Sequence, residues 1–411
     1  MTIVRVPDDT RTMARHGRLA PSRPLLSVIM FVAIALAVML VSGASVTTIA
    51  LAQLGSNVET VALPDDENLR PPAPGIEEFE GGFTMLIVGS DECVDTGGCP
   101  GRSEKLNDFT MLLHVAEDHQ SAVAVTFPRD LIVPIPACPR EDGTGSYNAM
   151  SAQQINVTLA YGGLACTIVT VRALTGLPIP YAGIMTFNGV REISTALGGV
   201  PVCIDAPISD PYSGLNLPAA GSYLVEGEQA LQFLRTRHGV GDGSDTGRIG
   251  SQQAFLASMV RKIKDSDSLS NFGTVLSLAT AASKNMTLSD NLGNVTSLAS
   301  MALVMKDIPL EKITFVKYPA GSREEAPGRV FPIQAAADDL FAKIAADEPF
   351  STDVNSLGTT TDPAASTEPT PSPDPASSES PDPAEPAASS PPVISGATGQ
   401  TAADQTCSRA F

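Results

Sequence analysis

The chain has 411 residues and a formal net charge of −19, from 26 Lys and Arg against 45 Asp and Glu. This charge excludes a protein that binds nucleic acid through bulk charge, because attraction to phosphates needs a basic face. An uncharged segment near the N-terminus also excludes an ordinary cytosolic enzyme, since it suits only a lipid bilayer.

That segment has no charged residue from Leu25 to Val58. Its most apolar part, Leu25 to Val46, spans ~33 Å as a helix at ~1.5 Å per residue, enough for a bilayer core of ~30 Å. Because five arginines precede it and acidic residues follow, the positive-inside rule places residues 1–24 in the cytoplasm and the rest outside. The alternative is a cleaved signal peptide with Ala50-Leu51-Ala52 as its cleavage site, but such apolar regions have ~7–15 residues. We therefore expect a single-pass membrane anchor.

The cysteines agree with export, since all six lie beyond the anchor: Cys93, Cys99, Cys138, Cys166, Cys203 and Cys407. No C-x-x-C is present and the four histidines are scattered, so no zinc site is indicated. Cys93 and Cys99 enclose a short Gly-rich loop and are predicted to pair, and Cys138 with Cys166 is the second predicted pair. Cys203 and Cys407 remain as the third. Six cysteines allow about 15 connectivities, and Cys203 could equally be a small buried hydrophobe in a strand.

Composition divides the exported part into three segments. Residues 47–82 form a linker rich in Pro and acids, and residues 83–347 form a folded domain. The remaining segment, 348–411, has few apolar side chains, and ten of the 33 prolines lie after Ser351. We expect this segment to be disordered throughout, because it has too little apolar surface to bury.

Within the domain, strand-like and helix-like patterns alternate along the chain. The expected strands are Phe83–Gly89, Phe109–Val115, Ser121–Phe127, Val200–Ile204 and a closing strand, Ile313–Tyr318. The expected helices are Cys166–Thr175, Asn188–Leu197, Glu226–Leu234, a helix capped by Asp245 or Thr246 that runs to about Lys264, Leu269–Ala282 and Leu292–Met305. This mixture predicts a three-layer α/β/α sandwich with a central mixed sheet.

Candidate functional side chains lie where these elements end. Arg129 and Asp130 follow a buried strand, and Asp91 and Asp108 lie at the end and the start of neighbouring strands. Three further arginines and a glutamine belong to two consecutive helices: Arg235, Arg237, Arg248 and Gln252. Arginine binds phosphate oxygens with two parallel hydrogen bonds, and Mg²⁺ is often held by one or two carboxylates. The pattern therefore indicates a site for a diphosphate and Mg²⁺.

Each signal also has a simpler interpretation. Arg129 with Asp130 could be a loop ion pair, and Arg248 with Asp245 a surface pair. Arg235 and Arg237 are also typical of a helix C-terminus. The loop 239–244 lacks the lysine of a phosphate-binding Walker motif, and His238 is better explained as a loop histidine than as a base.

Taken together, the motifs between Phe83 and about Lys264 resemble the LytR-CpsA-Psr family of bacterial cell-envelope proteins. The residues that carry this resemblance are VGSD, NDFTMLLHV, AVTFPRD, YGGLACTIVTVRALTGLPI, FNGVREISTALGGVPVCI, DPYSGLNLPAAG, EGEQALQFLRTRHGVGDGSD and GRIGSQQAFL. The cysteines, the TAADQTC ending and the low lysine content are similar to the actinobacterial members.

The resemblance implies a phosphotransferase that acts outside the membrane. It would move a glycopolymer from a polyprenyl-diphosphate carrier to peptidoglycan, at the C6 hydroxyl of N-acetylmuramic acid. By position, Asp91 and Asp108 would hold Mg²⁺ or Mn²⁺, while Arg129, Arg235, Arg237, Arg248 and Gln252 would bind the diphosphate. Asp130 would orient Arg129 or serve as a base.

Two expectations about this site concern the lipid and a missing arginine. The family often has an arginine just before the position of Asp108, where this chain has Leu106 and Asn107, so Arg102 in the preceding loop is the candidate replacement. The lipid groove is expected between the helices after Asn156 and Thr246, with Phe255, Leu256 and Met259 as lining candidates.

Two other functions use the same residues. One is a non-catalytic envelope regulator that binds polyprenyl lipids, and the other is a pyrophosphatase that releases the same intermediate to water. Two metal-binding carboxylates favour an enzyme over a pure binding protein, but the sequence does not separate transfer from hydrolysis.

Overall fold

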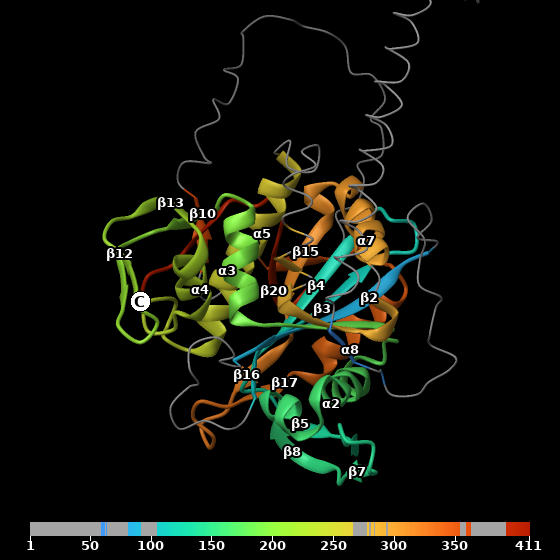
Figure 1. Ribbon diagram of the computed structural model, residues 1–411. Coiled ribbons are helices and arrows are strands. Elements are labelled where there is room, and N and C mark those ends of the chain that lie inside the picture. The colour runs from blue at the N-terminus through green and yellow to red at the C-terminus, as the bar shows by residue number, and fades with distance from the viewer. Residues whose placement is uncertain are drawn as a thin grey trace, which may run out of the picture. The chain divides into compact units, whose positions relative to one another are not determined.

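The computed structural model describes residues 59–61, 63, 81–91, 105–265, 278, 281–282, 284–292, 295–353, 359–362 and 392–411 (Figure 1). The predicted anchor, Arg102 and the predicted Cys93–Cys99 pair lie outside these residues.

The main feature is a nine-stranded sheet with both parallel and antiparallel neighbours. In spatial order its strands are β1 (Glu59–Val61), β14 (Met286–Ser289), β9 (Tyr181–Met185), β2 (Phe83–Ser90), β3 (Asn107–Val115), β4 (Ala122–Phe127), β15 (Ile313–Lys317), β20 (Val393–Thr401) and β18 (Ser351–Asp353). The predicted mixed sheet is confirmed. The predicted strand Ile313–Tyr318 is β15, which lies inside the sheet between β4 and β20.

The two faces of this sheet separate the apolar side chains of each strand. In β2, Leu86 and Val88 enter one core, while Met85 and Ile87 face the other. Side chains alternate with a period of two along a strand, so a strand that is apolar throughout must be covered on both faces.

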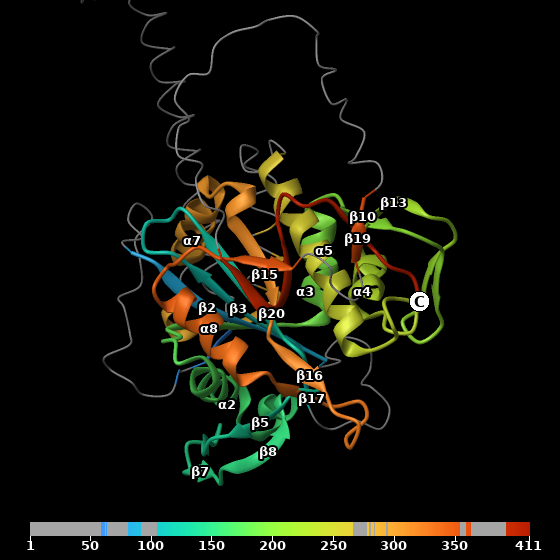
Figure 2. The same cartoon turned by 180° about the vertical axis from the view of Figure 1, so that it is seen from behind.

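Helices supply both covers. One face packs against α2 (Thr158–Thr175) and α8 (Gln334–Ala345), and the other against α5 (Asp245–Asp265) and α7 (Val295–Asp307). Figures 1 and 2 show these helices on opposite sides of the sheet. The predicted α/β/α sandwich is thus confirmed.

A second, four-stranded sheet lies beside α3 (Phe187–Ala196) and α4 (Gly227–Arg235) (Figure 1). Its strands, in order, are β13 (Gly221–Val225), β10 (Val200–Ile204), β21 (Thr406–Ser408) and β19 (Thr359–Thr361). Four two-stranded ribbons complete the described strands: β11 (Ile208–Asp210) with β12 (Leu215–Leu217), β16 (Ala320–Ser322) with β17 (Val330–Pro332), β5 (Ile132–Ile135) with β8 (Met150–Gln154), and β6 (Cys138–Pro139) with β7 (Ser146–Tyr147).

Helix α2 begins eight residues before the predicted start at Cys166. Gly162 and Gly163 have non-helical backbone angles and kink it, which breaks the helical pattern in the sequence. A Cβ on Gly162 would lie 2.6 Å from the carbonyl oxygen of Pro139, so the close packing there requires glycine.

Within the described residues, Ile155–Thr175 is the helical stretch long and apolar enough to cross a membrane. Because 56% of its apolar window is buried inside the fold, it is a core helix here.

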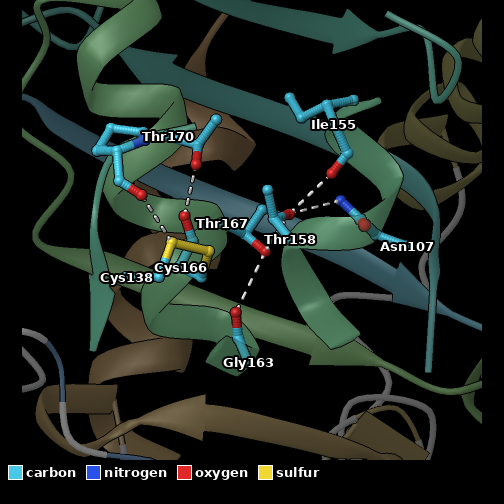
Figure 3. The surroundings of a disulfide bond; sticks show 9 residues. Asn107, Cys138, Ile155, Thr158, Gly163, Cys166, Thr167 and Thr170 are labelled. Carbon is cyan, nitrogen blue, oxygen red and sulfur yellow. Dashed lines mark hydrogen bonds between the residues drawn. A yellow bond between two sulfur atoms is a disulfide. The ribbon is translucent and has the colours of Figure 1, made fainter. Parts of the chain in front are cut away.

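The predicted Cys138–Cys166 disulfide is present and ties β6 to α2 (Figure 3). On the same helix, Thr158 Oγ1 donates to the carbonyl oxygen of Ile155 (2.8 Å) and accepts a hydrogen bond from Asn107 Nδ2 (3.4 Å). Asn107 begins β3, so this contact joins the helix to the edge of the sheet where the candidate site lies.

The expectation that residues 348–411 are disordered throughout is wrong for the end of the chain. Strand β20 pairs with β15 in the main sheet, and β21 pairs with both β10 and β19. The Cys203–Cys407 disulfide, the third predicted pair, joins β21 to β10. The segment VISGATGQT of β20 is poor in large apolar residues, so only its partners reveal it as a strand.

The aromatic cluster beneath β4 offers a test of the core. The ring of Phe127 lies 5.0 Å from that of Tyr318 and 6.4 Å from that of Phe341, so the cluster joins β4 to α8 and to the residue that follows β15. We expect Phe127→Ala to lower the free energy of unfolding by about 3–5 kcal/mol, through lost burial and the cavity left behind. Urea denaturation measures it, and Leu303→Ala, at a 51% exposed residue, should change stability by less than about 0.5 kcal/mol. Equal effects of the two changes would contradict this assignment of the core.

Candidate active site

The ends of β2, β3 and β4 bring the first site residues to one edge of the sheet. Because β2 and β3 are antiparallel, Asp91 after β2 lies opposite Leu106, whose amide donates to Asp91 Oδ1 (2.8 Å). Strand β4 runs antiparallel to β3, with Phe127 opposite Thr110. The chain after β4 therefore returns to Asp108, and Arg129 Nη1 donates to Asp108 Oδ1 at 2.6 Å.

Arg129 lies among three carboxylates. Its Nε is 3.7 Å from Asp130 Oδ2 and 3.8 Å from Asp245 Oδ1, and its backbone N–H donates to Asp245 Oδ2 (3.0 Å). Burial alone would lower the pKa of Arg129, but the attraction of Asp108, Asp245 and Asp130 outweighs it and raises the pKa. Arg129 is therefore a fixed cation, and the simple loop pair with Asp130 is only part of its surroundings.

The first turn of α5 supplies Asp245 and Arg248. The hydroxyl of Ser244, and not the predicted Asp245, caps the helix by accepting from the N–H of Gly247 (3.3 Å); the side chain of Thr246, the other predicted cap, lies outside what the structure describes. Asp245 is then available to the arginines: Arg248 donates to Asp245 Oδ1 and also to the carbonyl oxygen of Asp108 (3.2 Å). Both side chains are buried, so the alternative of a surface pair is wrong.

Arg237 reaches the same place from the turn after α4. Its Nη2 lies 3.7 Å from Asp130 Oδ2. Burial lowers the pKa of Arg237, and repulsion from Arg129 and Arg248 adds to this. We call the six side chains the arginine–carboxylate cluster: Asp108, Arg129, Asp130, Arg237, Asp245 and Arg248.

A buried carboxylate outside the cluster holds the turn of Arg237. Asp210 Oδ2 accepts from Thr236 Oγ1 (2.7 Å) and from the backbone N–H groups of Arg237 (3.1 Å) and His238 (3.3 Å). Burial alone would raise the pKa of Asp210, but these hydrogen bonds outweigh it and hold the pKa below its ordinary value. The ring of His238 lies beside the same carboxylate, with Nδ1 4.0 Å from Asp210 Oδ1, and its centroid is 4.5 Å from that of the Tyr212 ring in a tilted arrangement.

Asp130 is shared among several donors. Oδ1 accepts from Gln154 Nε2 (2.5 Å) and Arg329 Nη1 (3.3 Å), while Oδ2 faces Arg129 and Arg237. Because both of its oxygens face cations or an amide, the geometry suits Asp130 to orienting the arginines.

The cluster still has unused hydrogen-bond donors. Within the described residues, the Nε groups of Arg129, Arg237 and Arg248 are buried and have no hydrogen-bond partner. A buried donor without a hydrogen bond costs about 1–3 kcal/mol. The Nε of Arg129 lies within ion-pair distance of Asp130 and Asp245, and an anion with several oxygens could supply the hydrogen bonds that the three guanidinium groups lack. The arrangement is therefore suited to binding a phosphate or diphosphate group.

An apolar cavity of about 230 Å³ opens beside the cluster. Asp108 and Arg248 belong to the cluster and also line this cavity, and Phe255, Leu256 and Met259 line it as predicted. Its other walls come from α3, α4, β2, β3 and the residues around Met185. The expectation that the helix after Asn156 lines it is wrong, because α2 packs on the opposite face of the main sheet.

Arg235 and Gln252 lie at this cavity and outside the ion pairs of the cluster. The guanidinium of Arg235 lies 4.7 Å above the ring of Phe187, and both residues line the cavity. Gln252 Nε2 donates to the carbonyl oxygen of Leu234 (3.1 Å), which joins α5 to the end of α4. Their predicted binding of diphosphate stays a prediction.

The two carboxylates predicted to hold a metal fit a hard divalent cation. Asp91 and Asp108 lie at the same edge of β2 and β3. Arg129 engages Asp108 through Oδ1, and no other described residue has a hydrogen bond or ion pair with Oδ2. Mg²⁺ commonly uses one or two carboxylates together with phosphate oxygens of the substrate.

Four important residues were not assigned to the site from the sequence. Asp245 was treated as a cap or surface partner, and Gln154, Asp210 and Arg329 were not singled out. For Asp210, the one usable local signal was an acidic residue at the end of a short strand, in SDPY. Arg329 is 199 residues from Asp130 and lies in a segment with no motif.

A protein-family model matches the part of the chain that contains this site. The model of the LytR_cpsA_psr family matches residues 52–339, a range that contains the whole cluster and the cavity. The protein belongs to this family. The resemblance seen in the sequence motifs is thereby confirmed.

Three relatives of this family member are 27–30% identical to it over the aligned residues. Cell wall biosynthesis protein LcpA of Corynebacterium glutamicum is 27% identical over 269 residues, 59% of this chain and 51% of the relative. Biofilm regulatory protein A of Streptococcus mutans is 30% identical, over 50% of this chain and 49% of that protein. A polyisoprenyl-teichoic acid–peptidoglycan teichoic acid transferase, TagU of Enterococcus faecalis, is 28% identical, over 50% of this chain and 60% of that protein. The chain thus spans about half the length of the first two relatives.

Solved structures show the same fold. A LytR-Csp2A-Psr enzyme from Actinomyces oris superposes with a TM-score of 0.53 at 23% identity, covering 70% of this chain and 96% of that one. TagV of Bacillus subtilis gives 0.52 at 19% identity, covering 66% of this chain and all of that one (100%). The relative from Corynebacterium glutamicum agrees with the predicted actinobacterial type.

Asp210 gives a prediction that depends on pH. In Asp210→Asn the amide group faces N–H donors, so we expect a loss of about 1–3 kcal/mol of stability near neutral pH. The pKa of Asp210 in the folded chain is below its ordinary value of 3.8, so the carboxylate contributes fully above that value and loses its contribution as pH falls below it. Urea denaturation of both proteins near pH 7 and pH 3 should therefore show a difference that shrinks in acid. A difference that does not change with pH would contradict the role assigned to this carboxylate.

Proposed function

We propose that this family member transfers a glycopolymer from a polyprenyl-diphosphate carrier to peptidoglycan outside the cell membrane. The observation that carries the proposal is that the arginine–carboxylate cluster meets an apolar cavity, with Asp108 and Arg248 belonging to both. A lipid diphosphate has the same two parts, an anionic head and an apolar chain. The names of relatives that act on polyisoprenyl-linked teichoic acid support the same class of substrate.

The chemistry is a displacement at phosphorus. A hydroxyl oxygen of the acceptor, proposed to be the C6 hydroxyl of N-acetylmuramic acid, attacks the phosphorus that carries the glycan. The bridging P–O bond breaks, polyprenyl monophosphate leaves, and the hydroxyl proton passes to solvent or a nearby base. Negative charge spreads over the phosphoryl oxygens as this occurs, and guanidinium groups already in place stabilise it.

The residues divide this work by position. Arg129, Arg237 and Arg248 present their donors to the phosphates, and Asp108, Asp130 and Asp245 hold them in place. Asp91 and Asp108 would hold Mg²⁺ or Mn²⁺, which supplies further positive charge to the diphosphate when bound. The cavity between α3, α4 and α5 would take the first part of the lipid chain.

The first test is transfer of label from a polyprenyl-diphosphate glycan to peptidoglycan fragments by the full-length chain in mild detergent. We expect Arg129→Ala to lower the rate about 100- to 1,000-fold, the usual effect of removing one donor to a developing negative charge. Arg129→Lys keeps the charge and serves as a folding check, and it should stay low because lysine lacks the planar fork. Arg140→Ala is the matched control, since Arg140 stacks on Tyr147 in the β6–β7 hairpin outside the cluster.

The outcomes separate the three functions. Label on peptidoglycan that disappears with EDTA and in Asp108→Asn supports the metal-assisted transferase. Release of free glycan phosphate to water, with peptidoglycan present and unlabelled, would show a pyrophosphatase. Lipid that stays bound without turnover would show a binding protein and would contradict the catalytic roles proposed here.

A second test fills the cavity. Val190 lines it from α3, so Val190→Trp should block the lipid chain and lower binding of a long-chain polyprenyl diphosphate about tenfold or more. A short, water-soluble diphosphate should bind as before, because the cluster is intact. Val393→Trp places the same residue at a 64% exposed valine of β20 and should leave lipid binding unchanged. Normal long-chain binding in Val190→Trp would contradict the lipid site.

A further inference from the structure

The last three residues of the chain lie in extended contact with the loop that joins α4 to α5, through two backbone hydrogen bonds and one isolated bridge. The backbone N–H of Gly241 donates to the carbonyl oxygen of Arg409 (2.8 Å), and that of Phe411 donates to the carbonyl oxygen of Gly239 (3.1 Å). Between them, Val240 and Ala410 face each other in an antiparallel bridge. We call residues Arg409–Phe411 the C-terminal clamp and residues 239–244 the clamped loop.

The clamped loop carries a cluster residue at each end. Arg237 lies two residues before it, and Asp245, which holds both Arg129 and Arg248, follows it directly. Apart from the clamp, the loop is anchored by Val240, which is fully buried in the core cluster beside the second sheet, and by short-range hydrogen bonds. Gly241 and Gly243 have positive φ angles of 62° and 75°. A shift of this loop would therefore move Arg237 and Asp245 relative to Arg129.

The clamp itself is held firmly from behind. Strand β21 pairs with β10 and β19, and the Cys203–Cys407 disulfide fastens it. Asp205 adds two contacts: its N–H donates to the carbonyl oxygen of Ser408 (3.1 Å), and its Oδ1 accepts from the N–H of Ala410 (2.7 Å). The side chain of Phe411 lies over Gly243, where a Cβ would come within 3.4 Å of the ring.

We propose that the C-terminal clamp is a positioning element of the active site, which fixes the clamped loop so that Arg237 and Asp245 face the diphosphate. The clamp lies outside residues 52–339, the range that the family model matches, so this chain supplies the support from a segment beyond the family domain. The inference rests on the proposed function for its kinetic consequence, while its structural part stands without it.

The test uses the full-length chain in mild detergent and a variant that stops after Ser408. This variant keeps β21 and both cysteines of the Cys203–Cys407 disulfide and removes only the clamp. Phe411→Ala is the matched control, because it keeps both backbone hydrogen bonds to the loop. Hydrogen–deuterium exchange of residues 239–244, thermal unfolding, and kcat and KM for transfer are measured on all three proteins.

We expect the shortened chain to exchange the Gly241 amide at least tenfold faster, while Phe411→Ala changes it less than threefold. The kcat of the shortened chain should fall about 10- to 100-fold, because a displacement of about 1 Å in an active site can lower the rate by that factor. Its KM should change less, and its melting temperature should change little. Unchanged exchange in the loop, or a loss of kcat that merely follows a lower melting temperature, would overturn the clamp. If the unaltered chain transfers no label, the proposed function fails, and the exchange data still decide whether the clamp holds the loop.

Discussion

Three guanidinium groups gather in one partly buried place in this protein, and they can do so only because carboxylates lie among them. Buried like charges without partners would cost several kcal/mol per ion. Asp245 is central, because its carboxylate contacts the backbone N–H and the Nε of Arg129 and also accepts a hydrogen bond from Arg248. The carboxylates neutralise the arginines enough for folding and still leave three Nε donors without a hydrogen bond among the described residues. That imbalance is what makes the cluster a site for an anion.

The same elements that place the cluster also form the apolar cavity. Asp108 and Arg248 contribute to both, so the charged and the apolar surfaces meet with no intervening layer. Each comes from the start of an element, β3 or α5, whose later residues turn apolar. A ligand with a charged head on an apolar chain fits such a junction better than either a free phosphate or a free lipid.

Much of the fold and of the site could be predicted because its signals are local. Strand periodicity revealed β2, β3 and β4, and the residues directly after them include Asp91 and Arg129. The failures have physical causes too. The first half of α2 was not predicted, because the kink at Gly162 and Gly163 interrupts the helical pattern. Strand β20 was not predicted either, because it is only weakly apolar and is ordered by pairing with β15.

The sequence by itself determined the alternation of strands and helices, the family, and which arginines would be near strand and helix ends, because these depend on neighbouring residues. Only the tertiary structure decided which carboxylate neutralises which arginine. Arg129 and Asp245 are 116 residues apart, and Asp130 and Arg329 are 199 apart. Such pairs depend on strand order and register, which bring distant segments together, and the same holds for the residues after Ser408 that support the loop between α4 and α5.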